Sequence, residues 1–208
     1  MRLIISIFAA IITLSAPGRA DTITIVALGD SLTAGFQLPP GAGFPAQLQG
    51  ALNREGEDVM IIDAGVSGDT TSGGLSRLDW SVGPDTDAVI VALGGNDALR
   101  GLDPATTRAN LSEILDRLDA RGIPVLLAGM LAPVNLGEDY GNAFAAVFQD
   151  LAKRDIVFYP FFLEGVAANP DLNMSDGIHP TEEGVAVMVE NILPKVRELV
   201  DRANAQKS

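Results

Sequence analysis

A serine, an aspartate and a histidine in this chain have the types and spacing that nucleophilic chemistry requires. Ser31 follows the apolar segment 26–28 after a Gly-Asp pair. A serine hydroxyl is a weak nucleophile until a base accepts its proton, a third group holds that base, and donors await the oxyanion. The sequence contains one histidine. The base of any Ser-His pair must therefore be His179, and Asp176, three residues earlier, can reach its ring.

Small and polar residues also follow two further apolar segments. Gly68 lies in the segment 63–69, and Asn96 follows two glycines after the segment 88–93. Each residue has an ordinary structural interpretation, because Gly-Asp-Ser is common in turns and helix N-caps, and glycine or asparagine often occupies a left-handed turn. A lone histidine before a proline can equally be structural. The occurrence of all these types at strand ends, in this order, favours a functional site.

Short apolar segments rich in β-branched residues predict the strands that must position these groups. They cover residues 22–28, 59–62, 88–93, 125–128 and 156–159. Such runs are typical of strands buried on both faces of a parallel sheet. In a sheet of this kind ligands bind outside the carboxyl ends of the strands, and the polar segments lie there.

Helical periodicity separates the strands. The clearest helix begins after Asp103, an N-cap candidate followed by Pro104, and Gly122 ends it. Further helices are predicted over residues 44–54, 143–154 and 181–202. The last has apolar residues on one face, and Pro194 is expected to kink it. The alternation of strands and helices predicts a three-layer α/β/α sandwich with a five-stranded parallel sheet.

Composition limits the classes of function. The 208-residue chain is 47% hydrophobic, which suits one globular domain with a sizeable core. Cysteine is absent, so a disulfide framework, a thiolate nucleophile and a cysteine metal site are excluded. The net charge is -13, and the few basic residues are scattered. We therefore expect neither a nucleic-acid surface nor an anionic-membrane patch.

The first twenty residues are predicted to be a secretory signal peptide. Arg2 precedes the apolar run 3–16, and small residues lead to a cleavage site after Ala20. The run is shorter than the roughly 20 residues that span a bilayer. Residues 21–208 would then form a single periplasmic or secreted domain without stable membrane insertion. An uncleaved N-terminal anchor is the alternative.

The polar segments together resemble the blocks of the SGNH hydrolases, also called GDSL esterases and lipases. The sequence contains GDSLTAGF with Ser31, VSGDTTSGGL with Gly68, LGGNDALRG with Asn96, and DGIHPT with Asp176 and His179. All four blocks occur in order, and the likeness covers nearly the whole of residues 21–208. It is greatest to the bacterial periplasmic branch of thioesterases, lysophospholipases and arylesterases. The resemblance implies a flavodoxin-like SGNH hydrolase fold.

The same resemblance implies a mechanism. Ser31 would attack the acyl carbonyl, His179 would accept its proton, and Asp176 would orient His179. The backbone N–H groups of Ser31 and Gly68, with the side-chain amide of Asn96, would form the oxyanion hole. No metal or organic cofactor is implied, and we expect a monomer that acts on a small-molecule ester. Asp30 and Asp97 are interpreted as orienting or turn residues.

The substrate is the least determined part. Residues 70–79 and 131–141 are expected to be loops that wall an acyl pocket, and their small and apolar residues favour fatty acyl esters and acyl thioesters. Arylesters, lysophospholipids and acyl-CoA fall within this class. A carbohydrate O-acetylesterase and a non-catalytic secreted binding module are the alternatives. A flavodoxin-like nucleotide binder would need a glycine-rich phosphate loop that the first strand lacks.

Overall fold

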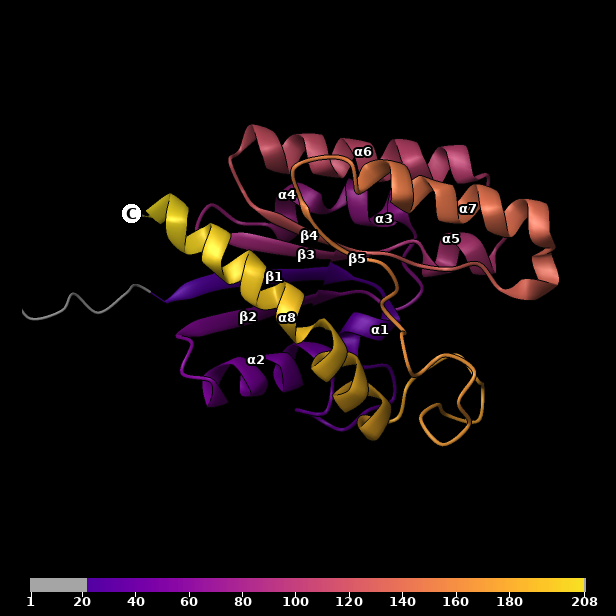
Figure 1. Ribbon diagram of the computed structural model, residues 1–208, viewed down its shortest axis with the longest axis horizontal. Helices are drawn as coiled ribbons and strands as arrows, with labels where there is room; N and C mark the ends of the chain where they lie inside the picture. Colours follow the sequence, from indigo (N-terminus) through magenta and orange to yellow (C-terminus); the bar gives the residue numbers. More distant parts are fainter. Residues whose placement is uncertain (1–21, 208) are drawn as a thin grey trace, which may run out of the picture.

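Five parallel strands form the centre of the molecule. The computed structural model describes residues 22–207, which include β1 (Ile23–Gly29), β2 (Val59–Gly65), β3 (Ala88–Ala92), β4 (Val125–Ala128) and β5 (Val157–Tyr159). Their spatial order is β2-β1-β3-β4-β5, and each neighbouring pair is parallel (Figure 1). This is the order of flavodoxin-like folds. The predicted fold class is confirmed.

Helices cover both faces of the sheet. α2 (Phe44–Arg54) and α8 (Glu182–Lys207) pack together on one face, while α3 (Thr71–Ser76), α6 (Pro104–Ala120) and α7 (Glu138–Leu151) lie on the other (Figure 1). The short elements are α1 (Ser31–Ala34), α4 (Leu78–Ser81), α5 (Gly95–Leu99) and the 3₁₀ turn η1 (Val134–Leu136). Three of these short elements directly follow a strand or strand-end loop at the carboxyl edge.

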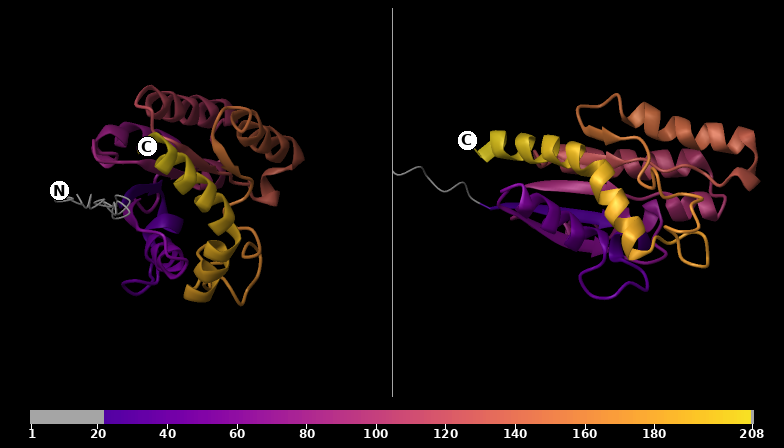
Figure 2. Two further views of the ribbon diagram at one scale, coloured as in Figure 1. Left: turned by 60° about the vertical axis from the view of Figure 1, so that its left-hand side comes forward. Right: turned by 60° about the horizontal axis from the view of Figure 1, so that its bottom comes forward.

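Sequence periodicity placed two of the long helices well. α2 has the predicted bounds, and α6 begins at Pro104 because the Asp103 side chain accepts a hydrogen bond from the Ala105 N–H. α8 extends five residues beyond the predicted end at 202. It contains Pro194, and its axis changes direction part-way along (Figure 2), as expected from the missing proline N–H.

Two segments predicted to be loops are partly helical. Within residues 70–79, the Thr70 hydroxyl caps α3 by accepting from the Gly73 N–H, and Thr71 is buried inside the fold. Within residues 131–141, η1 is followed by the first turn of α7. That helix starts at Glu138 rather than residue 143, because acidic residues in its first turn stabilise the helix N-terminus. The expectation that these segments are loops is wrong for the helical parts.

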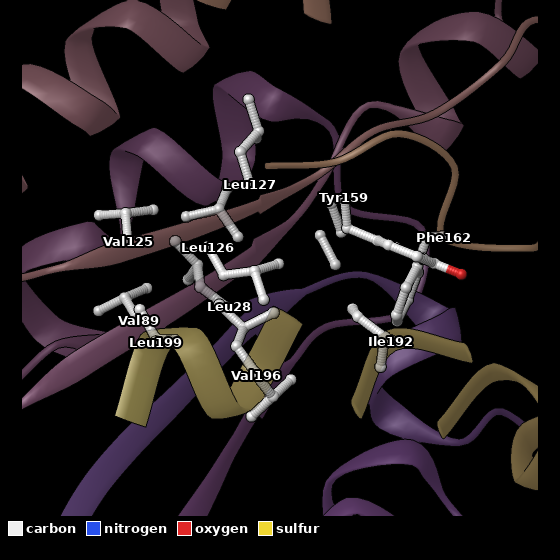
Figure 3. Packing of buried hydrophobic residues seen from close by; sticks show 14 of the residues in the cluster. Leu28, Val89, Val125, Leu126, Leu127, Tyr159, Phe162, Ile192, Val196 and Leu199 are labelled. Atoms are coloured by element: carbon white, nitrogen blue, oxygen red, sulfur yellow. The ribbon is translucent and has the colours of Figure 1, made fainter. Parts of the chain in front are cut away.

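The hydrophobic core lies between the sheet and the long helices. Val196 of α8 lies close to Leu28 of β1, and Ile192 of the same helix lies close to Phe162 (Figure 3). The apolar face predicted for α8 is buried at Val185, Met188, Val189, Ile192, Val196 and Leu199. Together with the buried residues of α2, α6 and α7, this packing holds the strands, and hence their carboxyl ends, in place.

One strand differs from the prediction of burial on both faces. β2 lies at the edge of the sheet, and its side chains Met60 and Ile62 are 45% and 39% exposed. The apolar run therefore identified a strand but not its position. Two side chains engage N–H groups of this strand, since Ile61 N donates to Gln49 Oε1 at 2.9 Å and Gly65 N to Asp63 Oδ1 at 2.8 Å. Such capping limits pairing with a further strand.

Candidate active site

The candidate site lies at the carboxyl edge of the sheet, where the strand order reverses. β1 runs between β2 and β3, and Gly29 pairs with Gly65 on one side and Ala92 on the other. The segments after these three strands therefore emerge side by side. This is the switch point at which open α/β sheets bind ligands.

α1 carries Ser31 directly above the end of β1. Its N-cap is Asp30, whose Oδ1 accepts from the Leu32 N–H at 3.0 Å. Glycine at the strand ends makes room for this short helix. A Cβ on Gly65 would lie 2.3 Å from Ala34 N, and one on Gly29 would lie 2.0 Å from Thr33 Oγ1. The glycine of the Gly-Asp-Ser motif is thus a requirement of close packing.

Ser31, His179 and Asp176 form a continuous hydrogen-bonded chain. His179 Nε2 lies 2.9 Å from Ser31 Oγ, and its Nδ1 lies 2.7 Å from Asp176 Oδ2. A carboxylate can only accept at Nδ1, so Nδ1 carries the proton and Nε2 presents its lone pair to the serine. The Phe36 ring packs against the imidazole, with ring centroids 4.4 Å apart. The structure brings together the three residues that the sequence predicted.

Asp176 is held as an anion by its own turn. The backbone N–H of His179, the His179 ring and the backbone N–H of Ile178 donate to it, and these bonds lower the pKa of the Asp176 carboxyl to about 2. The side chain is 39% exposed, so solvent also supports the charge. Asp176 can therefore fix the imidazole tautomer across the physiological pH range.

Asp30 is a second carboxyl close to the serine, and it is buried with 1% exposure. Burial raises the pKa of the Asp30 carboxyl to about 6, against the lowering effect of hydrogen bonds from the Leu32 N–H and the Asn96 amide. Asn96 Nδ2 donates to Asp30 Oδ2 at 3.1 Å. Asp30 thus joins the serine turn to α5 and orients the Asn96 side chain, which agrees with its interpretation as an orienting residue.

Gly68 occupies a tight turn after β2. Val66 N donates to Gly29 O, and Asp69 N donates back to Val66 O at 3.0 Å, which closes a four-residue turn. Gly68 stands at its third position with φ of +82°, a value that favours glycine as in a type II turn. The N–H of that position takes no part in the closing bond. Gly68 can therefore present its N–H to a ligand.

Asp97 has a different environment from the candidate triad. It is fully buried, and its carboxylate accepts from the Thr71 N–H and hydroxyl and from the Thr107 hydroxyl. These bonds tie α5 to α3 and α6. Asp97 is therefore positioned to hold the helix that carries Asn96.

Sequence reasoning missed two arginines that organise the site. Arg77 donates to Asp69 Oδ2, to Ala64 O and to Gly29 O, so it joins the ends of β1 and β2 to the Gly68 turn. Arg100 donates from Nη2 to Gly68 O at 2.6 Å. Their partners are mostly backbone carbonyls, which leave no pattern in a single sequence.

A cavity of about 600 Å³ adjoins the serine turn. It is lined by Ala34 and Gly35 of that turn, by the Pro- and Gly-rich segment 38–43, by α2 and by the edge strand β2. Its polar lining includes Gln49 and Asp63. The residues lining this cavity lie outside the segments 70–79 and 131–141 that were predicted to wall an acyl pocket.

The sequence matches a family model over the same motifs. Residues 27–187 match the GDSL-like Lipase/Acylhydrolase family. The chain belongs to this family. It is thus a GDSL-type hydrolase, and the resemblance inferred from the four motifs is confirmed.

Curated relatives cover almost the entire chain. The esterase TesA of Pseudomonas aeruginosa is 37% identical over 92% of this chain and 95% of its own length. The arylesterase of Vibrio mimicus is 39% identical over 82% and 86%. The thioesterase 1/protease 1/lysophospholipase L1 of Escherichia coli K12 is 35% identical over 94% and 92%.

Solved structures of this family superpose on the fold. The crystal structure of TesA matches with a TM-score of 0.80 and 38% identity, covering 85% of this chain and 99% of that one. AlinE4, an SGNH-hydrolase family esterase, matches with a TM-score of 0.74 and 46% identity, covering 87% and 98%. These likenesses support the assignment of both fold and family.

Proposed function

We propose that this GDSL hydrolase is a serine esterase that cleaves carboxylic acyl esters and acyl thioesters through an acyl-enzyme on Ser31. The observation that carries the proposal is the hydrogen-bonded chain from Ser31 Oγ through His179 to Asp176. This arrangement supplies a nucleophile, a base and an orienting anion in direct contact with one another.

In the acylation step, Ser31 Oγ attacks the acyl carbonyl carbon while its proton passes to His179 Nε2. The imidazolium that results is stabilised by Asp176, which remains ionised. The same proton then passes to the alcohol or thiol leaving group as the tetrahedral intermediate collapses. In the second half of the reaction water attacks the acyl carbonyl carbon and gives a proton to His179. The bond from the acyl carbon to Ser31 Oγ then breaks, His179 returns the proton to Ser31 Oγ, and the carboxylic acid is released.

Three donors are assigned to the oxyanion: the backbone N–H groups of Ser31 and Gly68, and the side-chain amide of Asn96. A primary amide has two N–H donors. Asn96 uses one on Asp30 Oδ2, and the other is assigned to the substrate. Donors fixed before reaction stabilise the developing negative charge without reorganisation.

Acyl esters and thioesters are favoured as substrates by the surroundings of the triad. Exposed apolar side chains lie in the segments that follow β2, β3 and β4 and in the turn before α8, namely Val66, Leu99, Leu131, Val134 and Ile178. Such a surface suits an acyl chain better than a charged group. The names of the relatives, which include arylesterase, thioesterase and lysophospholipase, support the same class.

We further propose that the protein acts outside the cytoplasm as a monomer. The apolar segment 3–16 and the small residues before position 21 support export, although residues 1–21 lie outside the described part of the structure. Within residues 22–207, no helix is long and apolar enough to cross a membrane. Residues 21–208 would act as one domain on a small-molecule ester, without nucleic acid.

A small substrate panel tests the proposal. p-Nitrophenyl acetate, a longer p-nitrophenyl ester, a lysophospholipid and an acetylated glycan are offered to the wild type and to Ser31→Ala and His179→Ala. The proposal expects turnover of the acyl esters, with loss of most of it in both variants. Turnover restricted to the glycan would indicate the O-acetylesterase alternative. Wild-type rates in the His179→Ala variant would exclude the proposed Ser-His-Asp mechanism.

A further inference from the structure

Arg100 is the residue outside the triad with the most informative contact. It is exposed at the end of α5, and its Nη2 donates to Gly68 O at 2.6 Å. In the part of the chain that the structure describes, Arg100 belongs to no ion pair with a carboxylate, although the protein carries a large excess of acidic residues. Its ordered contact is thus with a backbone carbonyl of the Gly68 turn.

We propose that Arg100 is a positioning residue that holds two oxyanion donors, Gly68 and Asn96, in a fixed relation. This inference rests on the proposed function. Asn96 lies in the first turn of α5, and Arg100 follows the last residue of the same short helix, where its N–H donates to Asn96 O at 3.2 Å. The side chain of Arg100 then reaches across to the Gly68 turn, which no strand pairing connects to α5.

The turn needs such a contact because its other anchors act on neighbouring residues. Arg77 holds Asp69 through Nε, and the Val66 N–H donates to Gly29 O. Gly68 itself is exposed and adopts φ of +82°. A glycine lacks a side chain to restrain it. The bond from Arg100 fixes the peptide that follows Gly68, and so limits rotation of the residue whose N–H faces the oxyanion.

Catalysis depends strongly on such placement, because displacement of a donor by a fraction of an ångström weakens a bond made only in the transition state. Loss of a whole oxyanion donor lowers kcat by roughly 10²–10³. Substitution of Arg100 would loosen the two oxyanion donors but would remove neither of them. We therefore expect its substitution to lower kcat by about 5- to 50-fold, with KM changed less than about 2-fold.

The chain offers a matched control. Arg121 is also exposed at a helix C-terminus, that of α6, and its Nη2 donates to a glycine carbonyl, Gly83 O, at 2.8 Å. Like Arg100, it donates to a glycine carbonyl, but it lies away from the Gly68 turn and Asn96. Arg121→Met should leave kcat and KM at wild-type values. Arg100→Lys keeps one cationic donor and should recover part of the rate that Arg100→Met loses.

The experiment measures kcat, KM and thermal unfolding for wild type, Arg100→Met, Arg100→Lys and Arg121→Met on neutral p-nitrophenyl butyrate and on an anionic acyl-CoA. The expected result is a lower kcat on both substrates for Arg100→Met, partial recovery in Arg100→Lys, and melting temperatures within about 2 °C of wild type, since the side chain is exposed.

Other outcomes would overturn the inference. An unchanged kcat on the neutral ester, with KM raised only for acyl-CoA, would make Arg100 a binder of anionic leaving groups. A lower melting temperature with a wild-type rate for the folded fraction would make it structural. If the wild type hydrolysed the esters and all variants had the same kcat and KM as the wild type, this inference alone would fail. If the wild type hydrolysed no ester, the proposed function would fail as well.

Discussion

At the residue scale, two carboxyls beside the candidate nucleophile have opposite environments. Asp176 is exposed and ionised by the hydrogen bonds that its turn donates, whereas Asp30 is buried and its pKa is raised to about 6. The first suits an anion that faces an imidazolium. The second suits a residue that orients Asn96 and caps α1. Their assignment to different roles follows from environment rather than residue type.

Asn96→Ala tests the oxyanion role. The lost amide should lower kcat by roughly 10²–10³, with KM changed far less, because the bond strengthens in the transition state. Stability should also fall modestly, since Asp30 loses a partner inside the protein. Steady-state kinetics and thermal unfolding on one preparation check this. A normal kcat in a destabilised protein would remove Asn96 from the site.

Asp30→Asn tests the burial of the second carboxyl. The folded-state pKa of about 6 lies above the ordinary value of 3.8, so the folded protein binds more protons between these values. The free energy of unfolding should therefore fall as pH rises from about 4 to about 6, by roughly 3 kcal/mol in total, and this contribution should be level above pH 6. Asparagine does not titrate. Urea unfolding across pH 4–8 should show this slope in the difference between wild type and variant, and a constant difference would contradict it.

At the element scale, the site depends on how closely α1 approaches the strand ends. Gly29 and Gly65 have paired positions in β1 and β2, and both lie against α1. The absence of a Cβ at these two positions lets the helix that begins at Ser31 pack directly on the sheet. The glycine of the Gly-Asp-Ser motif, which is typical of a turn, is therefore also required for the close packing of α1 on the sheet.

Gly65→Ala should destabilise the protein by about 1–3 kcal/mol or more, because its Cβ would overlap the backbone of Ala34. The rate should fall too, since the strain displaces the helix that carries Ser31. Gly141→Ala is the control: this glycine lies inside α7 with no atom within 4 Å of an added Cβ. It should stabilise by about 0.5–1 kcal/mol. Chemical denaturation of both variants gives the comparison, and equal effects would contradict the packing argument.

Local sequence signals predicted the helices and strands, but not which of them lie next to one another in the fold. The strands, α2 and the start of α6 follow from apolar periodicity and from the Asp103-Pro104 cap. The edge position of β2 depends on strand order, which its apolar residues do not encode. Likewise, α3 is stabilised by Asp97, a residue 26 positions from Thr71. The candidate triad was predictable because the chain contains one histidine and each member must be a particular residue type. Arg77 and Arg100 donate to backbone carbonyls, which any residue supplies, so the sequence does not reveal their partners.

At the scale of the whole molecule, the sheet places groups from four distant segments at one edge. Ser31 follows β1, Gly68 follows β2, Asn96 follows β3, and the turn with Asp176 and His179 precedes α8. The strand order makes this convergence possible.

Export can be tested on the full chain. Expression in a bacterial host should give a periplasmic product that begins at Asp21, because cleavage is expected after Ala20. Intact-mass measurement of the fractionated protein checks this. Replacement of Ala20 by a bulky residue should leave the precursor uncleaved. Recovery of the complete wild-type chain in the membrane fraction would support the uncleaved anchor instead.

Covalent labelling tests the central claim most directly. An activated serine attacks a fluorophosphonate at neutral pH, whereas ordinary serines do not. We predict one adduct per chain on Ser31 by peptide mapping, with no adduct in Ser31→Ala and strongly slowed labelling in His179→Ala. An adduct on Ser67, Ser72 or Ser175 instead, or full labelling without His179, would contradict the account.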